Sequence, residues 1–338
     1  MEAVPQGSTV AVTGAGGFIG SHVLRALVAA GYRPVAILRP SARAVPALDG
    51  VTVRYADVSN LRSLAEATEG ADAIIHLAGL ISTNARDRSD LIRVNVSGAK
   101  NVLQVTRRGR VKRLLFMSTT SAVGALYEDM PEYALNEHSP FNLDETRVDY
   151  VTAKRVAHKL ALGDRAAGLP VTVLSPSFVV GPGDSVRNST QLIDLVARGQ
   201  LPLVPRGGIN PIDVRDVAAA VVAALAHHDP AEHYILAGRQ NISLYRFAAQ
   251  VAHLAGTSAP RRRVPYALTL AVARVAETLF PQTGVTTAAA RLSRYFWYFD
   301  NGRACRDLGL APRPLNQSIA DTLDWLAASR ADPPICAA

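Results

Sequence analysis

The sequence predicts an α/β fold, in which a doubly wound parallel sheet is followed by a smaller, mostly helical C-terminal lobe. Two observations support this class. Short apolar segments rich in β-branched residues alternate with segments of helical periodicity through the first half of the chain. A glycine-rich turn follows the first of these segments directly. Because parallel strands need crossover connections, the alternation indicates a parallel sheet with helices on both faces.

The elements of the first half can be placed in order along the chain. We expect strands at residues 9–13, 34–38, 51–55, 73–77, 113–117 and 171–174. The helices between them are expected at residues 19–30, 61–69, 91–107 and 147–167. Residues 127–148 interrupt the pattern with a polar, proline-containing stretch, which is typical of a loop over the carboxyl ends of the strands.

The second half of the chain is mainly helical. We expect helices at residues 190–198, 217–226, 244–255 and 265–279, and one clear strand at residues 234–237. These patterns divide the chain into a sheet domain (residues 1–180), a helical lobe (181–330) and a tail (331–338). Some strands of the second part, for example one near residues 209–216, are expected to return to the large sheet.

Composition narrows the class of protein. With 338 residues, 49% of them hydrophobic and 19% charged, the chain resembles an ordinary globular protein rather than a disordered one. The net charge is +8, but the basic residues are scattered and only residues 261–263 form a run, which argues against a nucleic-acid partner. Cys305 and Cys336 lack metal-ligand spacing, and the longest apolar run, residues 217–226, is too short to span a bilayer. We therefore expect a cytoplasmic protein with no metal, nucleic-acid or membrane partner.

The glycine-rich turn has the spacing of a phosphate-binding turn. Gly14, Gly17 and Gly20 permit a sharp bend, close approach of the backbone to a pyrophosphate, and tight packing of the helix on the strand. The N–H groups of the first helical turn and the positive end of the helix dipole then face the anion. The strand, turn and helix together predict a dinucleotide cofactor in contact with the three glycines and with Phe18 and Ile19.

The residues after the second strand favour NADP(H) over NAD(H). In NAD sites an acidic residue about 20 positions after the turn binds the ribose 2′-hydroxyl, whereas a 2′-phosphate calls for arginine. No Asp or Glu occurs between Ala3 and Leu48, and Arg39 and Arg43 lie at this place. NAD(H) remains possible, because the two arginines also suit solvated loop positions in an arginine-rich protein.

Two other strand ends supply expected cofactor contacts. Asp57 and Val58 follow the third strand and are placed to meet the adenine, although an Asp here also suits a helix cap. Leu77, Ala78 and Gly79 end the fourth strand, where small residues allow close approach to the nicotinamide half.

An acid–base pair is expected on the helix at residues 147–167. Tyr150 and Lys154 are four residues apart and therefore share one helical face. A nearby ammonium group stabilises phenolate and brings the pKa of the phenol toward the working range. At the end of the fifth strand, Ser118, Thr119 and Thr120 offer hydroxyls that can bind a substrate oxygen as charge develops on it.

Together these motifs resemble the extended short-chain dehydrogenases/reductases, the NAD-dependent epimerase/dehydratase family, whose sheet is of the Rossmann type. The motifs are TGAGGFIG, HLAG, NVSGAKNV, the Ser-Thr pair at 118 and 119, and YVTAK. The resemblance covers nearly the whole chain and is greatest to dihydroflavonol reductases, 3-beta-hydroxysteroid dehydrogenases and hopanoid-associated sugar epimerases.

The resemblance implies roles for individual residues. Thr119, the second residue of the Ser-Thr pair, is implied as the catalytic hydroxyl, with Ser118 and Thr120 as alternatives. Tyr150 is implied to exchange a proton with the substrate oxygen, Lys154 also to hold the nicotinamide ribose, and Asn95 to support the site. Ser177 belongs to the implied cofactor contacts, and a homodimer is common among such relatives.

Two departures from the nucleotide-sugar members of this family favour a reductase. Those members usually carry Arg-x-Phe-Asn where residues 175–178 are Ser-Pro-Ser-Phe, and an Arg-Asp strand start where residues 210–214 are Asn-Pro-Ile-Asp-Val. The aromatic residues that would suit a flat apolar ketone are Phe178, Tyr266, Phe296, Trp297 and Tyr298. We therefore predict an NADP(H)-dependent ketone or aldehyde reductase that works by hydride transfer on an apolar small molecule. The alternatives are a nucleotide-sugar epimerase or dehydratase that retains its cofactor, and an NADP-binding redox-sensing regulator.

Overall fold

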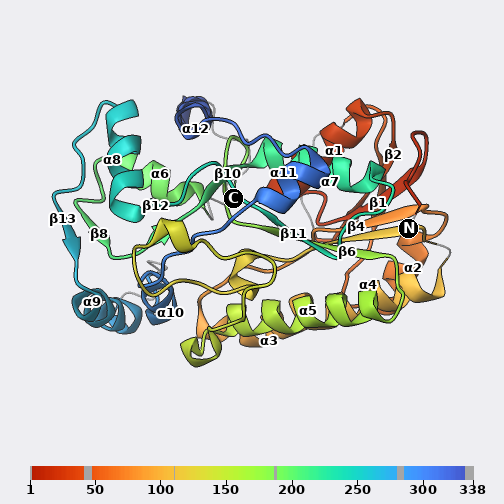
Figure 1. The fold of residues 1–338 in the computed structure, drawn as a ribbon, viewed down its shortest axis with the longest axis horizontal. Helices are drawn as coiled ribbons and strands as arrows, with labels where there is room; N and C mark the ends of the chain where they lie inside the picture. Colours follow the sequence, from red (N-terminus) through yellow and green to blue (C-terminus); the bar gives the residue numbers. More distant parts are fainter. Residues whose placement is uncertain (1, 42–47, 110, 186–188, 280–284, 332–338) are drawn as a thin grey trace.

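The computed structural model describes residues 2–41, 48–109, 111–185, 189–279 and 285–331 (Figure 1). Arg43, one of the two arginines expected at the cofactor, lies outside these residues, as does nearly all of the expected tail.

A seven-stranded sheet forms the centre of the structure, and all of its neighbouring strands are parallel. From edge to edge its strands are β11 (His233–Leu236), β6 (Val171–Pro176), β5 (Arg113–Met117), β4 (Ala73–His76), β1 (Thr9–Thr13), β2 (Arg33–Leu38) and β3 (Thr52–Tyr55). The strand order reverses between β1 and β4, which is the switch point where open α/β sheets bind their ligands. The predicted doubly wound parallel sheet is confirmed.

Helices cover both faces of the sheet (Figure 1). One face carries α1 (Phe18–Ala29), α7 (Val214–Ala226) and α11 (Gly302–Leu308), and the other carries α2 (Leu61–Thr68), α4 (Gly98–Arg108) and α5 (Asp149–Ala166). Because both faces are covered, β4, β5 and β6 are buried along their whole length and are nearly continuous apolar runs. The helix expected at residues 91–107 is in fact α3 (Arg88–Leu91), a π-helical turn (Ile92–Ser97) and α4.

The second part of the chain packs around a core of its own. It contains three two-stranded pairs, β7 (Phe178–Val180) with β10 (Pro211–Asp213), β8 (Leu203–Pro205) with β13 (Arg262–Val264), and β9 (Gly208–Ile209) with β12 (Ile242–Ser243). Its helices are α6 (Thr190–Ala197), α8 (Leu244–Leu254), α9 (Tyr266–Leu279), α10 (Thr287–Leu292) and α12 (Leu315–Ala331).

The strand that returns to the large sheet is β11, and the expectation of a returning strand near residues 209–216 is wrong. That segment holds β9 and β10, which pair outside the large sheet, and Pro211 at the start of β10 has no N–H to donate to a ladder. The four residues of β11 are all buried, and they extend the sheet beside β6 after α7 has crossed its face.

A bilayer-spanning helix would need a length and an apolar character that none of the described helices has. Nor do three or more His, Cys, Asp or Glu side chains gather anywhere in the described residues in a way that would hold a metal ion.

Candidate active site

The glycine-rich turn packs directly against the end of β4. Gly14 has a φ of +67°, which favours glycine, and a Cβ placed there would lie 2.6 Å from the backbone nitrogen of Ala78. A Cβ on Gly20 would clash with the carbonyl oxygen of Gly14. Neither position accepts a side chain, so the backbone of the turn packs directly on the segment after β4 and on the start of α1, and the three form one surface.

The N-terminus of α1 lies at this surface. Gly17 is its N-cap, and no side chain caps the helix. The first N–H groups of a helix have no partner within it, and they carry the positive end of the helix dipole. Phe18, Ile19 and Gly20 form this first turn. An uncapped helix start above a glycine-rich turn fits the pyrophosphate of a dinucleotide.

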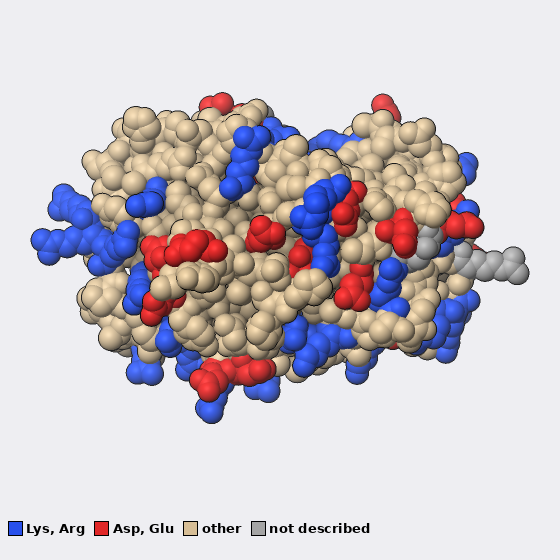
Figure 2. All heavy atoms as spheres, viewed as in Figure 1, with Lys and Arg blue, Asp and Glu red and all other residues tan. Residues whose placement is uncertain are grey.

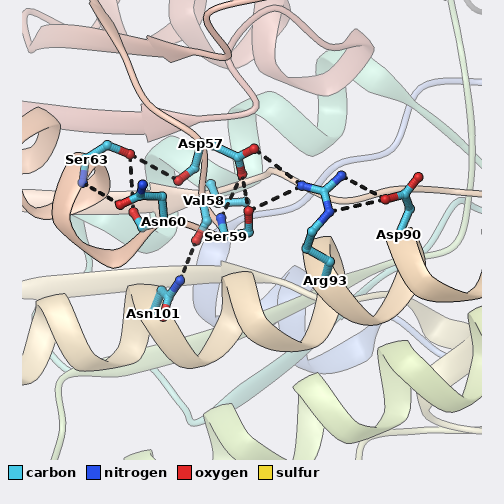
Figure 3. A network of polar contacts seen from close by, with 8 residues as sticks. All are labelled: Asp57, Val58, Ser59, Asn60, Ser63, Asp90, Arg93 and Asn101. Atoms are coloured by element: carbon cyan, nitrogen blue, oxygen red, sulfur yellow. Dashed lines mark hydrogen bonds and ion pairs between the residues drawn. The ribbon is translucent and has the colours of Figure 1, made fainter.

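Asp57 lies in a polar network beyond β3, together with Ser59 and Arg93 (Figure 3). Ser59 donates to Asp57 Oδ1 from its backbone N (2.8 Å) and its Oγ (2.7 Å), and a terminal nitrogen of Arg93 lies 3.4 Å from Asp57 Oδ2. Burial acts to raise the pKa of Asp57, but these hydrogen bonds and the charges of Arg93 and Arg39 lower it overall. Asn60, and not Asp57, caps α2, so the alternative of a helix cap does not apply to Asp57.

Arg39 and Val58 flank this network. Arg39 is exposed directly after β2, and it is close enough to Asp57 for their charges to interact. The carbonyl of Val58 accepts a hydrogen bond from Asn101 Nδ2 on α4 (2.8 Å), which fixes this segment against the helix (Figure 3). Three of the residues expected near the adenine and its ribose are therefore neighbours.

Asn95 ties the segment after β4 to the π-helical turn. Its Oδ1 accepts the N–H of Leu80 and its Nδ2 donates to the carbonyl of Leu80, both at 2.9 Å. A Cβ on Gly79 would lie 3.2 Å from Asn95 Oδ1 and 3.8 Å from Lys154 Nζ. Because Asn95 is buried and both atoms of its amide bind the main chain, its geometry is that of a supporting residue.

Tyr150 and Lys154 lie on the face of α5 that meets the strand ends. Lys154 Nζ donates to the carbonyl of Met117, the last residue of β5, at 3.2 Å. Burial lowers the pKa of Lys154 to about 8. Burial also raises the pKa of Tyr150, and hydrogen bonds with the side chains of Thr119 and Ser121 offset only part of this rise. The net shift is upward, opposite to the lowering that we expected from a neighbouring ammonium group.

Of the three hydroxyls after β5, that of Thr119 faces Tyr150. Ser118 is buried, and its Oγ lies 2.9 Å from His158 Nδ1. Thr120 is buried as well, whereas Thr119 is half-buried and hydrogen-bonds Tyr150. The structure thus brings together Thr119, Tyr150 and Lys154, with Ser118 directed away from them.

Ser121 is a member of this cluster that the sequence analysis missed. Its Oγ donates to Thr119 Oγ1 at 3.3 Å, and it also hydrogen-bonds Tyr150. Thr119 caps the short 3-10 helix Thr120–Ala122, which turns Ser121 back toward α5. The sequence carried one signal, a further hydroxyl two positions after Thr119, but only the turn shows that both face the same helix.

Ser177 is not part of this cluster. It is half-buried after β6, and its Oγ donates to Asn210 Oδ1 at 3.1 Å. Asn210 also binds Asn241 and the backbone of Gly238, so Ser177 belongs to a network that joins β6 to the second part of the chain.

The ring of Tyr150 packs in an apolar cluster built from both parts of the chain. Val151 and Tyr295 are buried members of this cluster, and Leu292 and Trp297 pack against it. Of the five aromatic residues suggested by the sequence, Trp297 alone belongs to this cluster. Tyr295, which was not among them, lies with its ring centroid 5.9 Å from that of Trp297.

Comparison with known proteins decides the family. The profile of the NAD dependent epimerase/dehydratase family matches residues 10–237. The chain belongs to this family. Its membership confirms the resemblance seen in the sequence motifs, and it makes the chain an NAD(P)-dependent oxidoreductase, as predicted.

Individual members of the NAD dependent epimerase/dehydratase family match nearly the whole chain. Sterol demethylase protein B of Methylococcus capsulatus is 31% identical over 94% of this chain and 98% of its own length. A putative dihydroflavonol 4-reductase of Synechocystis is 30% identical over 93% of each chain. The crystal structure of gox2253 superposes with a TM-score of 0.81 at 28% identity, covering 95% of this chain and 98% of that one.

Proposed function

We propose that this protein is an NADP(H)-dependent reductase of ketones or aldehydes that takes an apolar small molecule. The observation that carries the proposal is the convergence of polar groups from Thr119, Tyr150 and Lys154 beside the glycine-rich turn. The Synechocystis relative is named as a reductase, which supports this reaction class. The apolar cluster that Tyr150 shares with Tyr295, Leu292 and Trp297 supports an apolar substrate.

The chain offers a separate group of residues for each part of the cofactor. Gly14, Gly17, Phe18, Ile19 and Gly20 would hold the pyrophosphate. Asp57 and Val58 would meet the adenine, and Leu77, Ala78 and Gly79 would lie along the nicotinamide half.

Carbonyl reduction requires a hydride at carbon and a proton at oxygen. A reduced nicotinamide dinucleotide supplies the hydride when it is bound. Tyr150 donates the proton, because its raised pKa keeps the phenol protonated at neutral pH. Thr119 donates a hydrogen bond to the same oxygen while negative charge develops there. The ammonium group of Lys154 then stabilises the phenolate that remains, and the substrate leaves as an alcohol.

The surroundings of Arg39 support NADP(H) over NAD(H). Arg39 is exposed at the end of β2, where a 2′-phosphate would gain a charge-assisted partner. Asp57 interacts electrostatically with Arg39 and is already bound by Ser59 and Arg93. Its carboxylate is therefore poorly placed to serve as the acceptor that an NAD ribose needs.

Removal of the Tyr150 hydroxyl tests the proposed mechanism. We expect Tyr150→Phe to lower kcat for NADPH-dependent carbonyl reduction by about 10²–10⁴-fold, with the KM for NADPH little changed, because only the proton is lost. The measurement is NADPH absorbance in a screen of apolar ketones and aldehydes. Tyr133→Phe, at a position 65% exposed, is the matched control and keeps the wild-type rate. An unchanged rate in Tyr150→Phe would rule the mechanism out, and cofactor that is regenerated on the enzyme would identify an epimerase.

Charge reversal at Arg39 tests the choice of cofactor. Because a hydrogen bond to a charged group contributes about 1.5–3 kcal/mol, Arg39→Asp should shift the ratio of kcat/KM for NADPH and NADH toward NADH by about 10- to 100-fold. Arg33→Asp places the same charge at the opposite, exposed end of β2 and should leave the ratio unchanged. Equal ratios in Arg39→Asp and wild type would remove the support for NADP(H).

A further inference from the structure

Helix α9 turns an apolar face toward solvent. Leu268, Val272, Val275 and Leu279 are spaced by four, three and four residues and are between 53% and 63% exposed. Residues with this spacing share one side of a helix, and we call them the α9 stripe. Ala273 is the one residue of α9 that is buried. A contiguous exposed stripe of large apolar residues marks a surface that meets a partner.

Exposed arginines lie close to α9 in the chain. Arg261, Arg262 and Arg263 are exposed on the segment that leads into α9, and Arg274 is exposed on α9 itself. Among the described residues, none of these arginines forms an ion pair. Figure 2 shows basic side chains projecting from the end of the molecule that carries β13 in Figure 1.

The α9 stripe belongs to a unit that also borders the candidate site. Glu277 on α9 accepts the N–H of Thr287 at the start of α10 (3.0 Å), and α10 contributes Leu292 to the cluster around Tyr150. Thr286, the N-cap of α10, donates from Oγ1 to Thr83 Oγ1 (2.7 Å) in the loop that follows β4. Next to this contact, Val285 and Ile81 add further exposed apolar surface.

We propose that α9 lies in the surface of an anionic lipid bilayer, with the α9 stripe toward the acyl chains and the exposed arginines at this end of the molecule among the headgroups. An exposed apolar helical face near arginines without ion pairs is the pattern of interfacial helices. This inference goes beyond the proposed function and does not rest on it.

The proposal revises the expectation that the protein has no membrane partner. That expectation came from the absence of an apolar run of about 20 residues, which a helix that crosses the bilayer needs. A helix that lies in the plane of the surface needs only one apolar face. The described helices include none that could span a membrane, and the proposal does not require one.

Vesicle co-sedimentation of the full chain tests the proposal. We expect the wild type to sediment with vesicles of phosphatidylcholine mixed with phosphatidylglycerol, and far less with phosphatidylcholine alone. Val272→Glu combined with Val275→Glu should weaken binding to the anionic vesicles at least tenfold, because two carboxylates would enter the acyl region. Leu254→Glu adds a carboxylate at an exposed apolar position of α8 and should bind as the wild type does.

Two further measurements distinguish lipid binding from dimer formation and from loss of the fold. Arg261→Glu combined with Arg262→Glu should abolish the preference for anionic vesicles, and added salt should weaken wild-type binding. NADPH consumption with a water-miscible ketone should be the same in wild type and in the Val272/Val275 variant. Equal rates would show that the variant is folded and that the loss of vesicle binding is separate from catalysis. The proposal is overturned if the wild type stays in the supernatant with anionic vesicles at low salt. It is also overturned if light scattering shows a dimer that the Val272/Val275 variant dissociates while vesicle binding stays unchanged.

Discussion

At the scale of single residues, Lys154 holds a charge in surroundings that disfavour it. Burial lowers its pKa from 10.5 to about 8, and no carboxylate of the described residues offsets this cost. The hydrogen bond to the carbonyl of Met117 keeps its ammonium group beside β5. A side chain that destabilises the fold is retained where activity needs it, so we expect stability and activity to respond in opposite directions when Lys154 is replaced.

Lys154→Met should therefore be inactive but more stable than the wild type at neutral pH. The folded-state pKa lies below the unfolded one, so the ammonium is unfavourable below pH 8, and this cost disappears as pH rises from about 8 to 10.5. We expect the free energy of unfolding to rise by about 1 kcal/mol near pH 7 and by less near pH 10. The rise is well below the full value of the pKa shift, because Lys154 is partly exposed and its hydrogen bond is lost. Urea unfolding without cofactor measures this. Lys159 is exposed on the same helix, so Lys159→Met should change neither the activity nor the free energy of unfolding. A stability gain in Lys154→Met that grows with pH would contradict the argument.

At the scale of elements, one buried hydrogen bond joins helix α5 to the segment after β5. These two segments carry Thr119, Tyr150 and Lys154. Ser118 begins the segment after β5 that carries Thr119, and His158 lies one turn after Lys154 on α5. Their side chains meet at 2.9 Å, and both are buried. Burial lowers the pKa of His158 to about 4, so the imidazole is neutral at working pH. The pair therefore sets the position of β5 relative to α5 without adding charge.

Ser118→Ala should weaken this contact between α5 and the segment after β5. We expect the free energy of unfolding to fall by about 1–3 kcal/mol, because His158 loses a buried partner. The value of kcat should fall about tenfold as Thr119 shifts relative to Tyr150, while the KM for NADPH changes little. Thr172→Val is the matched control, because Thr172 is fully buried and its Oγ1 has no hydrogen-bond partner among the described residues. A purely structural role would show as lost stability with unchanged kcat.

At the scale of the whole molecule, an ion-pair network joins the large sheet to the second part of the chain. Asp213 caps α7, and Arg215 binds it at 2.8 Å while also binding Asp321 on α12 at 2.6 Å. Arg313 binds Asp216 on α7 at 2.9 Å. Burial acts to raise the pKa of Asp213, but hydrogen bonds from Arg215 and others lower it overall. The network holds α12, whose residues complete the core of the second part, against α7.

Arg215→Met should destabilise the protein in a pH-dependent way. The pKa of Asp213 is lower in the folded state, so its contribution is present above its unfolded pKa of 3.8 and is lost as pH falls through the folded value. We expect a loss of about 2–4 kcal/mol near pH 7, because a buried carboxylate loses its nearer arginine and keeps only Arg313 at 3.5 Å, and a smaller loss near pH 3. Urea unfolding at both pH values measures the difference. Arg62→Met, which breaks an exposed ion pair with Glu66, should have almost no effect, because the Arg62 side chain is 91% exposed. A loss that does not shrink in acid would contradict this role of Asp213.

Features that depend on short spacing were predictable from the sequence. The parallel sheet follows from alternating apolar and helical segments, the phosphate-binding turn from the spacing of Gly14, Gly17 and Gly20, and the Tyr150/Lys154 pair from one helical turn. Each of these signals lies within one element or one βα unit, where backbone geometry relates spacing to position. The family resemblance depended on the same short motifs.

Other features were decided by contacts between distant residues. Thr119 faces Tyr150 and Ser118 does not, because Ser118 is bound to His158. The seventh strand, β11, pairs with β6 because α7 ends beside that edge of the sheet. The link between α10 and the loop after β4 includes a contact between Thr83 and Thr286, which are 203 residues apart. No local pattern encodes such pairs, because they form only when separate elements pack. The sequence by itself determined the class of fold and the chemical groups available, and the tertiary structure alone decided which of those groups face one another and which face solvent.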